Sequence, residues 1–148
     1  MDIRECRDSD RDNIIALWDA CGLLRPWNDP NTDIDLALGA ETATILVGTR
    51  DGAVIASVMA GFDGHRGWVY YVSVHPDARG HGLGRDIMAA AEHWLAARGA
   101  VKMQLLVRDG NVPAERFYEA LGYDVQPVKA YGKWLDGREA PVRGKETP

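Results

Sequence analysis

Residues 75–88 read HPDARGHGLGRDIM, a stretch in which three glycines stand at every second position. An apolar stretch, residues 68–74 (WVYYVSV), precedes the glycines, and a run with helical spacing begins at Leu83. Glycine is unfavourable inside regular structure, so three together indicate that something needs access to the backbone. A helix that starts here presents unpaired backbone N–H groups and the positive end of its dipole, which suit a phosphate. The stretch therefore predicts an anion site between a strand and a helix.

Two common nucleotide-binding motifs do not fit this loop. The P-loop requires GxxxxGK[ST], and no lysine follows the glycines. The dinucleotide fingerprint GxGxxG also fails, because Arg85 or Ile87 stands where its third glycine is needed. A nicotinamide-dependent oxidoreductase is therefore a poor interpretation. The two alternatives that remain are a pyrophosphate site and a glycine turn that only packs tightly.

The size and charge of the chain indicate its domain organisation and the kind of partner it binds. The chain has 148 residues, of which 46% are hydrophobic and 26% charged, as in a soluble globular protein. We expect one domain over residues 1–136 and a flexible tail over residues 137–148, where charge, Gly and Pro dominate. The net charge is −5, and the 17 basic residues are scattered among 22 acidic ones, which argues against a nucleic-acid partner and suits a cationic one.

The chain contains no signal for export or membrane insertion. Charged residues follow Met1 at once, so no signal peptide is expected, and no apolar run approaches membrane-spanning length. We therefore predict a cytoplasmic protein without a membrane partner. The four histidines show no metal-ligand spacing with one another or with the two cysteines, so no metal is expected.

Hydrophobic periodicity predicts a mixed sheet with helices on its faces, an α+β or three-layer α/β/α domain. The hairpin around Asp51-Gly52 is the strongest local signal. An edge strand among the closing strands could pair with a second chain, so a homodimer is one alternative. The expected order is a strand at 2–6, helices at about 9–21 and 31–40, strands at 44–50, 53–62 and 68–74, a helix at 83–98, a strand at 101–107, a helix at 113–121, and closing strands at 123–128 and 130–135.

The glycine stretch also resembles a known family. Arg79-Gly80-His81-Gly82-Leu83-Gly84 after an apolar strand resembles the RxxGxG/A acyl-CoA signature of the GNAT superfamily of N-acetyltransferases. Residues 111–123 (NVPAERFYEALGY) look like the family's second motif, N..A..[FL]YE..G[FY], and the element order is similar over residues 2–135. Residues 23–30 and 61–76 further resemble small stand-alone bacterial members.

The resemblance implies that acetyl-CoA is the co-substrate and where it binds. Backbone N–H groups from Arg79 to Gly84, with Arg85 beside them, would hold the pyrophosphate. The strand end at 72–74 would pair with the pantetheine arm. A bulge near Tyr71-Val72 would splay this strand from the strand at 101–107, and a strand N–H there would donate to the thioester carbonyl. The full expected set is Val72, Ser73, Val74, Arg79, Gly80, His81, Gly82, Leu83, Gly84, Arg85, Asn111, Ala114 and Tyr118.

The same resemblance implies a general acid for the reaction but leaves the general base open. Tyr118 stands where the family has its general acid beside the sulfur; the alternative is a core tyrosine whose hydroxyl is satisfied. No carboxylate occurs in residues 68–71 or 104–107, where many relatives carry a glutamate base. Asp29, Asp63 and His65, or a water relayed by Tyr70 or Tyr71, remain as alternatives for the base.

The acceptor site is expected between the loop after the first helix and the strand hairpins. Trp27, Asn28 and Asp29, with Tyr70 or Tyr71 opposite, would enclose a cationic amine with ring faces and one carboxylate. The alternative is that Trp27 and the prolines only pack the loop. The resemblance thus implies an N-acetyltransferase that transfers the acetyl group to a primary amine of a small molecule, peptide or protein by direct attack in a ternary complex. A non-catalytic acyl-CoA-binding sensor is the second hypothesis.

Overall fold

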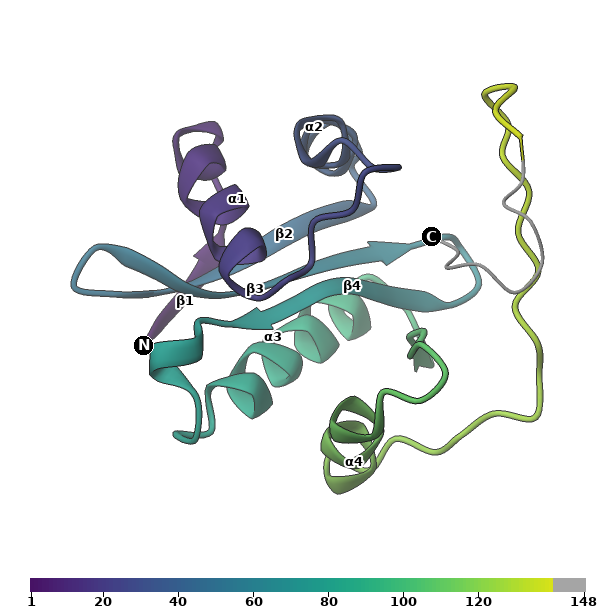
Figure 1. Cartoon of the computed structure of the whole chain (residues 1–148). Helices are drawn as coiled ribbons and strands as arrows, with labels where there is room; N and C mark the ends of the chain where they lie inside the picture. Colours follow the sequence, from purple (N-terminus) through teal and green to yellow (C-terminus); the bar gives the residue numbers. More distant parts are fainter. Residues whose placement is uncertain (140–148) are drawn as a thin grey trace. The chain divides into compact units, whose positions relative to one another are not determined.

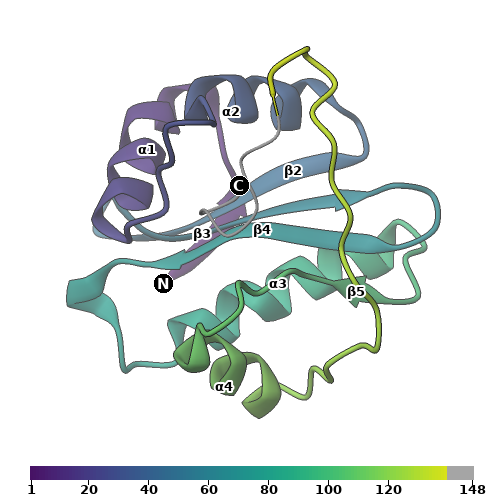
Figure 2. The ribbon, with the colours of Figure 1, turned by 45° about the vertical axis from the view of Figure 1, so that its right-hand side comes forward.

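The computed structural model describes residues 1–139 of the chain. It separates into two compact units, Met1–Leu106 and the part that begins at Val107. Figures 1 and 2 show the elements of each unit. The two units are described one after the other below.

The first unit is built on a five-stranded sheet in the order β1-β2-β3-β4-β5. Its first three pairings are antiparallel and the last, between β4 and β5, is parallel. The mixed, mostly antiparallel sheet of an α+β fold is therefore confirmed. The strands are β1 (Asp2–Glu5), β2 (Ala43–Arg50), β3 (Ala53–Phe62), β4 (Gly67–Val74) and β5 (Met103–Gln104).

Helices cover both faces of this sheet, with α1 (Arg11–Ala20) and α2 (Pro30–Gly39) on one side and α3 (Leu83–Ala97) on the other (Figures 1 and 2). Each helix buries an apolar stripe against the strands, which is the main source of its stability. The buried residues on the first face include Ile14, Trp18, Ile34, Ile45 and Val47. The stripe of α3 consists of Leu83, Ile87, Met88, Ala91, Trp94 and Leu95.

Local turn chemistry explains two boundaries in this unit. Asp51 and Gly52 both have positive φ, at 52° and 79°, as a tight hairpin turn requires, so the predicted hairpin is confirmed. Helix α2 begins slightly earlier than expected. Its N-cap is Asp29, whose side chain accepts from the N–H of Asn31, and Pro30 occupies the first helical position.

Of the three strands predicted near the end of the chain, one is shorter than expected and two are wrong. The expected strand at 101–107 is reduced to Met103–Gln104. In the described residues after Val107, the one regular element is helix α4 (Val112–Ala120), so the closing strands at 123–128 and 130–135 are not formed. Their apolar residues find no sheet face to cover: Val125, Val128, Tyr131 and Leu135 are 74–93% exposed. Residues 123–139 therefore offer no closing strand through which a second chain could pair. Residues 140–148 of the expected tail lie outside the described part.

Candidate active site

The glycine loop leads from β4 into α3 and leaves its backbone open. Gly80 and Gly82 have φ of 84° and 78°, a left-handed conformation that glycine adopts without strain, and Gly82 is the N-cap of α3. A Cβ added at either glycine would meet nothing within 4 Å. Tight packing therefore does not require glycine at these two positions, and the interpretation as a glycine turn that only packs tightly does not apply to them. The open space beside them suits a ligand that approaches the backbone.

The helix start supplies the hydrogen-bond donors of this loop. Asp86 donates its N–H to the carbonyl of Gly82 at 3.1 Å, the first bond of the helix ladder. The N–H groups before it lie ahead of the ladder, where an anion would be the natural partner. The Arg79 side chain turns back and donates from Nε to the carbonyl of Val74 at 3.2 Å. His81 and Arg85 are exposed beside the loop.

Strand β4 carries the predicted bulge. Ser73 pairs with Ser57 and Tyr70 with Met59, so Tyr71 and Val72 together face a single residue of β3. Tyr71 has a φ of 52°, and Asp51 in the hairpin turn is the other non-glycine residue with positive φ in residues 1–139. A bulky residue in this conformation is strained and persists only where its surroundings hold it.

Beyond the bulge, one edge of β4 has no strand beside it. The ladder with β5 consists of two pairs, Gly67 with Met103 and Trp68 with Gln104. From Val69 to Val74, this edge of β4 therefore has no strand partner within residues 1–139. The backbone groups on this edge that have no partner can pair with an extended ligand, as an added strand would. The carbonyl of Val74 already accepts from Arg79 and Cys21.

A buried network of side-chain hydrogen bonds holds the backbone of the bulge. The indole Nε1 of Trp18 donates to the Ser57 hydroxyl at 2.9 Å, and that hydroxyl donates to the carbonyl of Tyr71 at 3.1 Å. The hydroxyl of Ser73 lies 2.7 Å from that of Ser57 and is buried, so this side chain serves the network and leaves only its backbone to a ligand. The network satisfies its buried polar groups and fixes the backbone of the bulge.

The side chain of Tyr71 extends from the bulge to the helices on the first face. Its ring stacks on Trp18, and its hydroxyl donates to Oδ2 of Asp33 in α2 at 2.5 Å. Burial first, and then the hydrogen bond to Asp33 and that residue's charge, raise the pKa of Tyr71 far above its ordinary value. Tyr71 therefore keeps its proton at neutral pH and donates it in the hydrogen bond to Asp33.

Two carboxylates considered for the acceptor site or the base have structural partners. Asp29 caps α2 by accepting from the N–H of Asn31 at 2.9 Å and from the hydroxyl of Thr32 at 3.2 Å. Asp63 accepts the N–H groups of Arg66 and His65, which lower its pKa. The fold also brings a further carboxylate, Asp33, to the side chain of Tyr71 in β4, and the sequence did not single this residue out. The one sequence feature that could have identified Asp33 is its position one helical turn after Asp29. The hydrophobic periodicity of residues 30–39 was too weak to predict which face of the helix meets the sheet.

The remaining acceptor residues differ in their exposure. Trp27 is partly buried and Asn28 is exposed, both in the loop between α1 and α2. Tyr70 is 48% exposed on β4, and burial and the charge of Asp63 raise its pKa. Of the residues expected to enclose an amine, Tyr71 is the one that the structure joins to a carboxylate.

The second unit holds the other motif residues. Asn111 is the N-cap of α4 and accepts from the N–H of Ala114 at 3.3 Å. Tyr118 is partly buried and packs edge-on against Phe117 and Tyr123, with ring centroids 5.0 and 6.0 Å away. Burial raises the pKa of Tyr118. Within residues 1–139 its hydroxyl makes no hydrogen bond, so it is unlike the satisfied core tyrosine of the alternative interpretation.

A family model matches most of the chain, over residues 11–123, and describes the Acetyltransferase (GNAT) family. The chain belongs to this family of acetyltransferases. An acetyltransferase of Yersinia enterocolitica is 44% identical over 135 residues, which cover 91% of this chain and 96% of the relative. An acetyltransferase of Yersinia pseudotuberculosis is 42% identical with the same coverage. The protein is therefore an acetyl-CoA-dependent transferase.

Solved structures show the same fold as this GNAT acetyltransferase. The aminoglycoside N-acetyltransferase AAC(6')-Iy, in complex with a bisubstrate analogue, has a TM-score of 0.78 at 20% identity and covers 90% of this chain and 98% of its own. The AAC(6')-IG enzyme of Acinetobacter haemolyticus has a TM-score of 0.73 at 17% identity, with coverage of 92% and 100%. At such identities the likeness establishes the fold.

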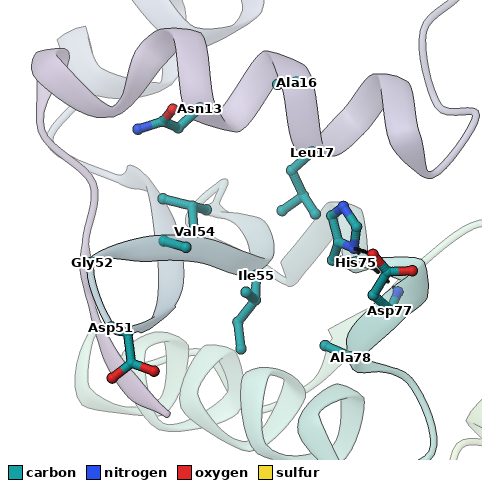
Figure 3. A pocket seen from close by; sticks show the side chains of 11 residues that line it. Asn13, Ala16, Leu17, Asp51, Gly52, Val54, Ile55, His75, Asp77 and Ala78 are labelled. Carbon is teal, nitrogen blue, oxygen red and sulfur yellow. Dashed lines mark hydrogen bonds and ion pairs between the residues drawn. The ribbon is translucent and has the colours of Figure 1, made fainter.

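One cavity of the acetyltransferase lies apart from the predicted site residues (Figure 3). It has a volume of about 740 Å³ and is lined by α1, the β2–β3 turn and the segment that follows β4. His75 and Asp77 lie together at one end of it and Asp51 at the other. None of the predicted site residues lines this cavity.

Among residues 1–139 of the acetyltransferase, no three His, Cys, Asp or Glu side chains come together as metal ligands would. No helix in the described part of the chain is both long enough and apolar enough to cross a bilayer.

Proposed function

We propose that this acetyltransferase transfers the acetyl group of acetyl-CoA to a primary amine of a small-molecule acceptor by direct attack in a ternary complex. The observation that carries the proposal is the continuity of β4 with the glycine loop. The bulge at Tyr71-Val72, the unpaired edge up to Val74 and the open loop from Arg79 follow one another along a single stretch of backbone. Such a stretch offers a ligand both strand pairing and an anion seat.

The residues present suit the phosphates and the arm of acetyl-CoA. The backbone N–H groups from Arg79 to Gly84 would hold the pyrophosphate, because the open space at Gly80 and Gly82 lets it approach, and Arg85 would add a positive charge. The edge at Val72–Val74 would pair with the pantetheine arm. The nitrogen of Asn111 would donate to the same arm, since its oxygen is used in the helix cap.

Acetyl-CoA supplies the acetyl group as a thioester, and the chain supplies hydrogen-bond donors and a proton. The neutral amine nitrogen forms a bond to the carbonyl carbon and gives up one proton to water, and the carbon–sulfur bond breaks. The thiolate takes a proton from a donor that water then reprotonates. A strand N–H at the bulge would donate to the oxyanion, a contribution on the order of 2.7–4 kcal/mol to the barrier. Tyr118 would protonate the sulfur, and its raised pKa keeps that proton available at neutral pH.

An amine acceptor is supported by the charge of the chain and by its structural neighbours. The net charge of −5 favours a cationic partner. Two neighbours with the same fold are described as aminoglycoside N-acetyltransferases, whose substrates carry several amines. Amino sugars and alkyl amines are therefore the first acceptors to test.

Ligand binding and turnover test this proposal separately. The purified protein would be heated with acetyl-CoA, CoA or NAD in parallel, because a ligand at 100 times its Kd adds about 2.7 kcal/mol and raises the midpoint by several degrees. We expect a rise with the two CoA species alone. No rise with either would contradict the proposed site, whereas a rise without release of free thiol in the presence of any amine would favour the sensor hypothesis.

A further inference from the structure

The acidic residues at the start of α2 have different partners. Asp29 caps the helix, and Asp35 forms an ion pair with Arg11 at 2.5 Å. Asp33 lies between them in sequence and points to the sheet, where Oδ2 accepts from the Tyr71 hydroxyl. Within the part of the chain that the structure describes, Oδ1 of Asp33 makes no hydrogen bond, and no Lys or Arg forms an ion pair with this carboxylate.

A partly buried carboxylate without a cation is unfavourable in an isolated protein. Asp33 is partly buried, and the neutral hydroxyl of Tyr71 satisfies one oxygen without balancing the charge. Arg11 of α1, which reaches α2, is already shared by Asp8 and Asp35. Within residues 1–139, Asp33 is thus a carboxylate beside the strand of the proposed site that no lysine or arginine balances.

The link between Asp33 and the bulge is rigid. Tyr71 has a strained backbone, its carbonyl is held by Ser57, and its ring stacks on Trp18 with centroids 3.8 Å apart. Strain of this kind is kept where it has a use or where packing imposes it. Here it directs the hydroxyl of Tyr71 to Asp33 and so fixes the carboxylate at one distance from the bulge.

We propose that Asp33, held by Tyr71, binds an ammonium group of the acceptor, and that this group is not the nitrogen that is acetylated. The inference rests on the proposed function and deepens it. The whole side chain of Tyr71 separates Asp33 from the backbone of the bulge, where the thioester would lie. A cation at Asp33 is therefore too far away to attack, and the acceptor carries a second amine several bonds from the first. Asp33 is then the residue that selects diamines over monoamines.

Matched pairs of acceptors provide the test. The probes are 1,5-diaminopentane against pentylamine, and neamine against glucosamine, in an assay of thiol release at saturating acetyl-CoA. The variants are Asp33→Asn, Tyr71→Phe, which removes the hydroxyl and keeps the ring on Trp18, and Asp35→Asn as the control on the same helix. Calorimetric titration of each diamine into the protein saturated with CoA measures binding without turnover.

We expect wild type and Asp35→Asn to favour the diamine of each pair by roughly ten- to hundredfold in kcat/KM. Asp33→Asn should remove this preference through the KM and Kd of the diamine, with acetyl-CoA binding unchanged, and Tyr71→Phe should reduce it. Equal rates for diamine and monoamine in wild type, or a preference that survives in both variants, would overturn the inference alone. Acetyl-CoA binding without turnover of any probe would favour the sensor hypothesis and so contradict the proposed function as well. Failure to bind acetyl-CoA would instead overturn the proposed function on which it rests.

Discussion

The indole of Trp18 lies flat on the ring of Tyr71, with centroids 3.8 Å apart and planes within 9° of parallel. The contact joins α1 to the bulge of β4 at the point where the strand loses its neighbour. The same indole donates to Ser57, which in turn holds the carbonyl of Tyr71. One buried residue of α1 therefore fixes both the ring and, through Ser57, the backbone of the bulge.

Replacing Ser57 with alanine should destabilise the protein and loosen the bulge. The change leaves the indole N–H of Trp18 without an acceptor and the carbonyl of Tyr71 without a donor, at a cost of about 1–3 kcal/mol. Urea denaturation measures the loss, and acetyl transfer should fall as well. Ser9→Ala, at an exposed site, is the control and should stay within about 0.5 kcal/mol of wild type. Equal midpoints for the two variants would contradict the role of the network.

Gly82→Val should weaken acetyl-CoA binding tenfold or more. A branched side chain at φ of 78° strains the N-cap of α3 and fills the open space beside the loop. Gly99→Val is the matched control, since Gly99 lies just beyond the other end of α3, also has positive φ, and also faces open space. Calorimetry on both folded variants separates binding from strain. Undiminished affinity in Gly82→Val would remove the loop from the site.

Tyr118→Phe should lower kcat by about 10²-fold and leave the affinity for acetyl-CoA unchanged, because only the donated proton is lost. The ring remains packed against Phe117 and Tyr123. Tyr131→Phe, at a position 93% exposed, is the control. A kcat equal to that of wild type would show that another group protonates the sulfur.

The pair of Tyr71 and Asp33 should make stability depend on alkaline pH. The pKa of Tyr71 is raised in the folded protein, so folding holds its proton more tightly than the unfolded chain does. The resulting stabilisation is fully present below the ordinary tyrosine pKa of about 10 and is lost as pH rises above it. Urea midpoints from pH 8 to 11 should therefore fall more steeply for wild type than for Tyr71→Phe. Parallel curves would contradict the burial and bonding of this hydroxyl.

Several features of the chain could be predicted from the sequence because they depend on neighbouring residues. The open glycine loop at residues 80–84, the tight turn at Asp51-Gly52 and the start of a helix near residue 113 all follow from local backbone chemistry. The two family motifs, residues 79–84 and 111–123, are likewise short continuous stretches. The family, the order of the main elements and the glycine loop were therefore predictable from the sequence. The bulge at Tyr71-Val72 came with the resemblance to that family.

Tertiary structure decided what depends on residues far apart in the chain. The sequence could not show that apolar segments after residue 123 form no strand, because a strand needs a partner edge and a face to cover. Nor could it distinguish Asp33 from Asp29, since both are acids at the start of one short helix. Only the packing of α2 against the sheet turns Asp33 to Tyr71 and leaves Asp29 as a cap, because the direction of a side chain depends on which helix face meets the sheet.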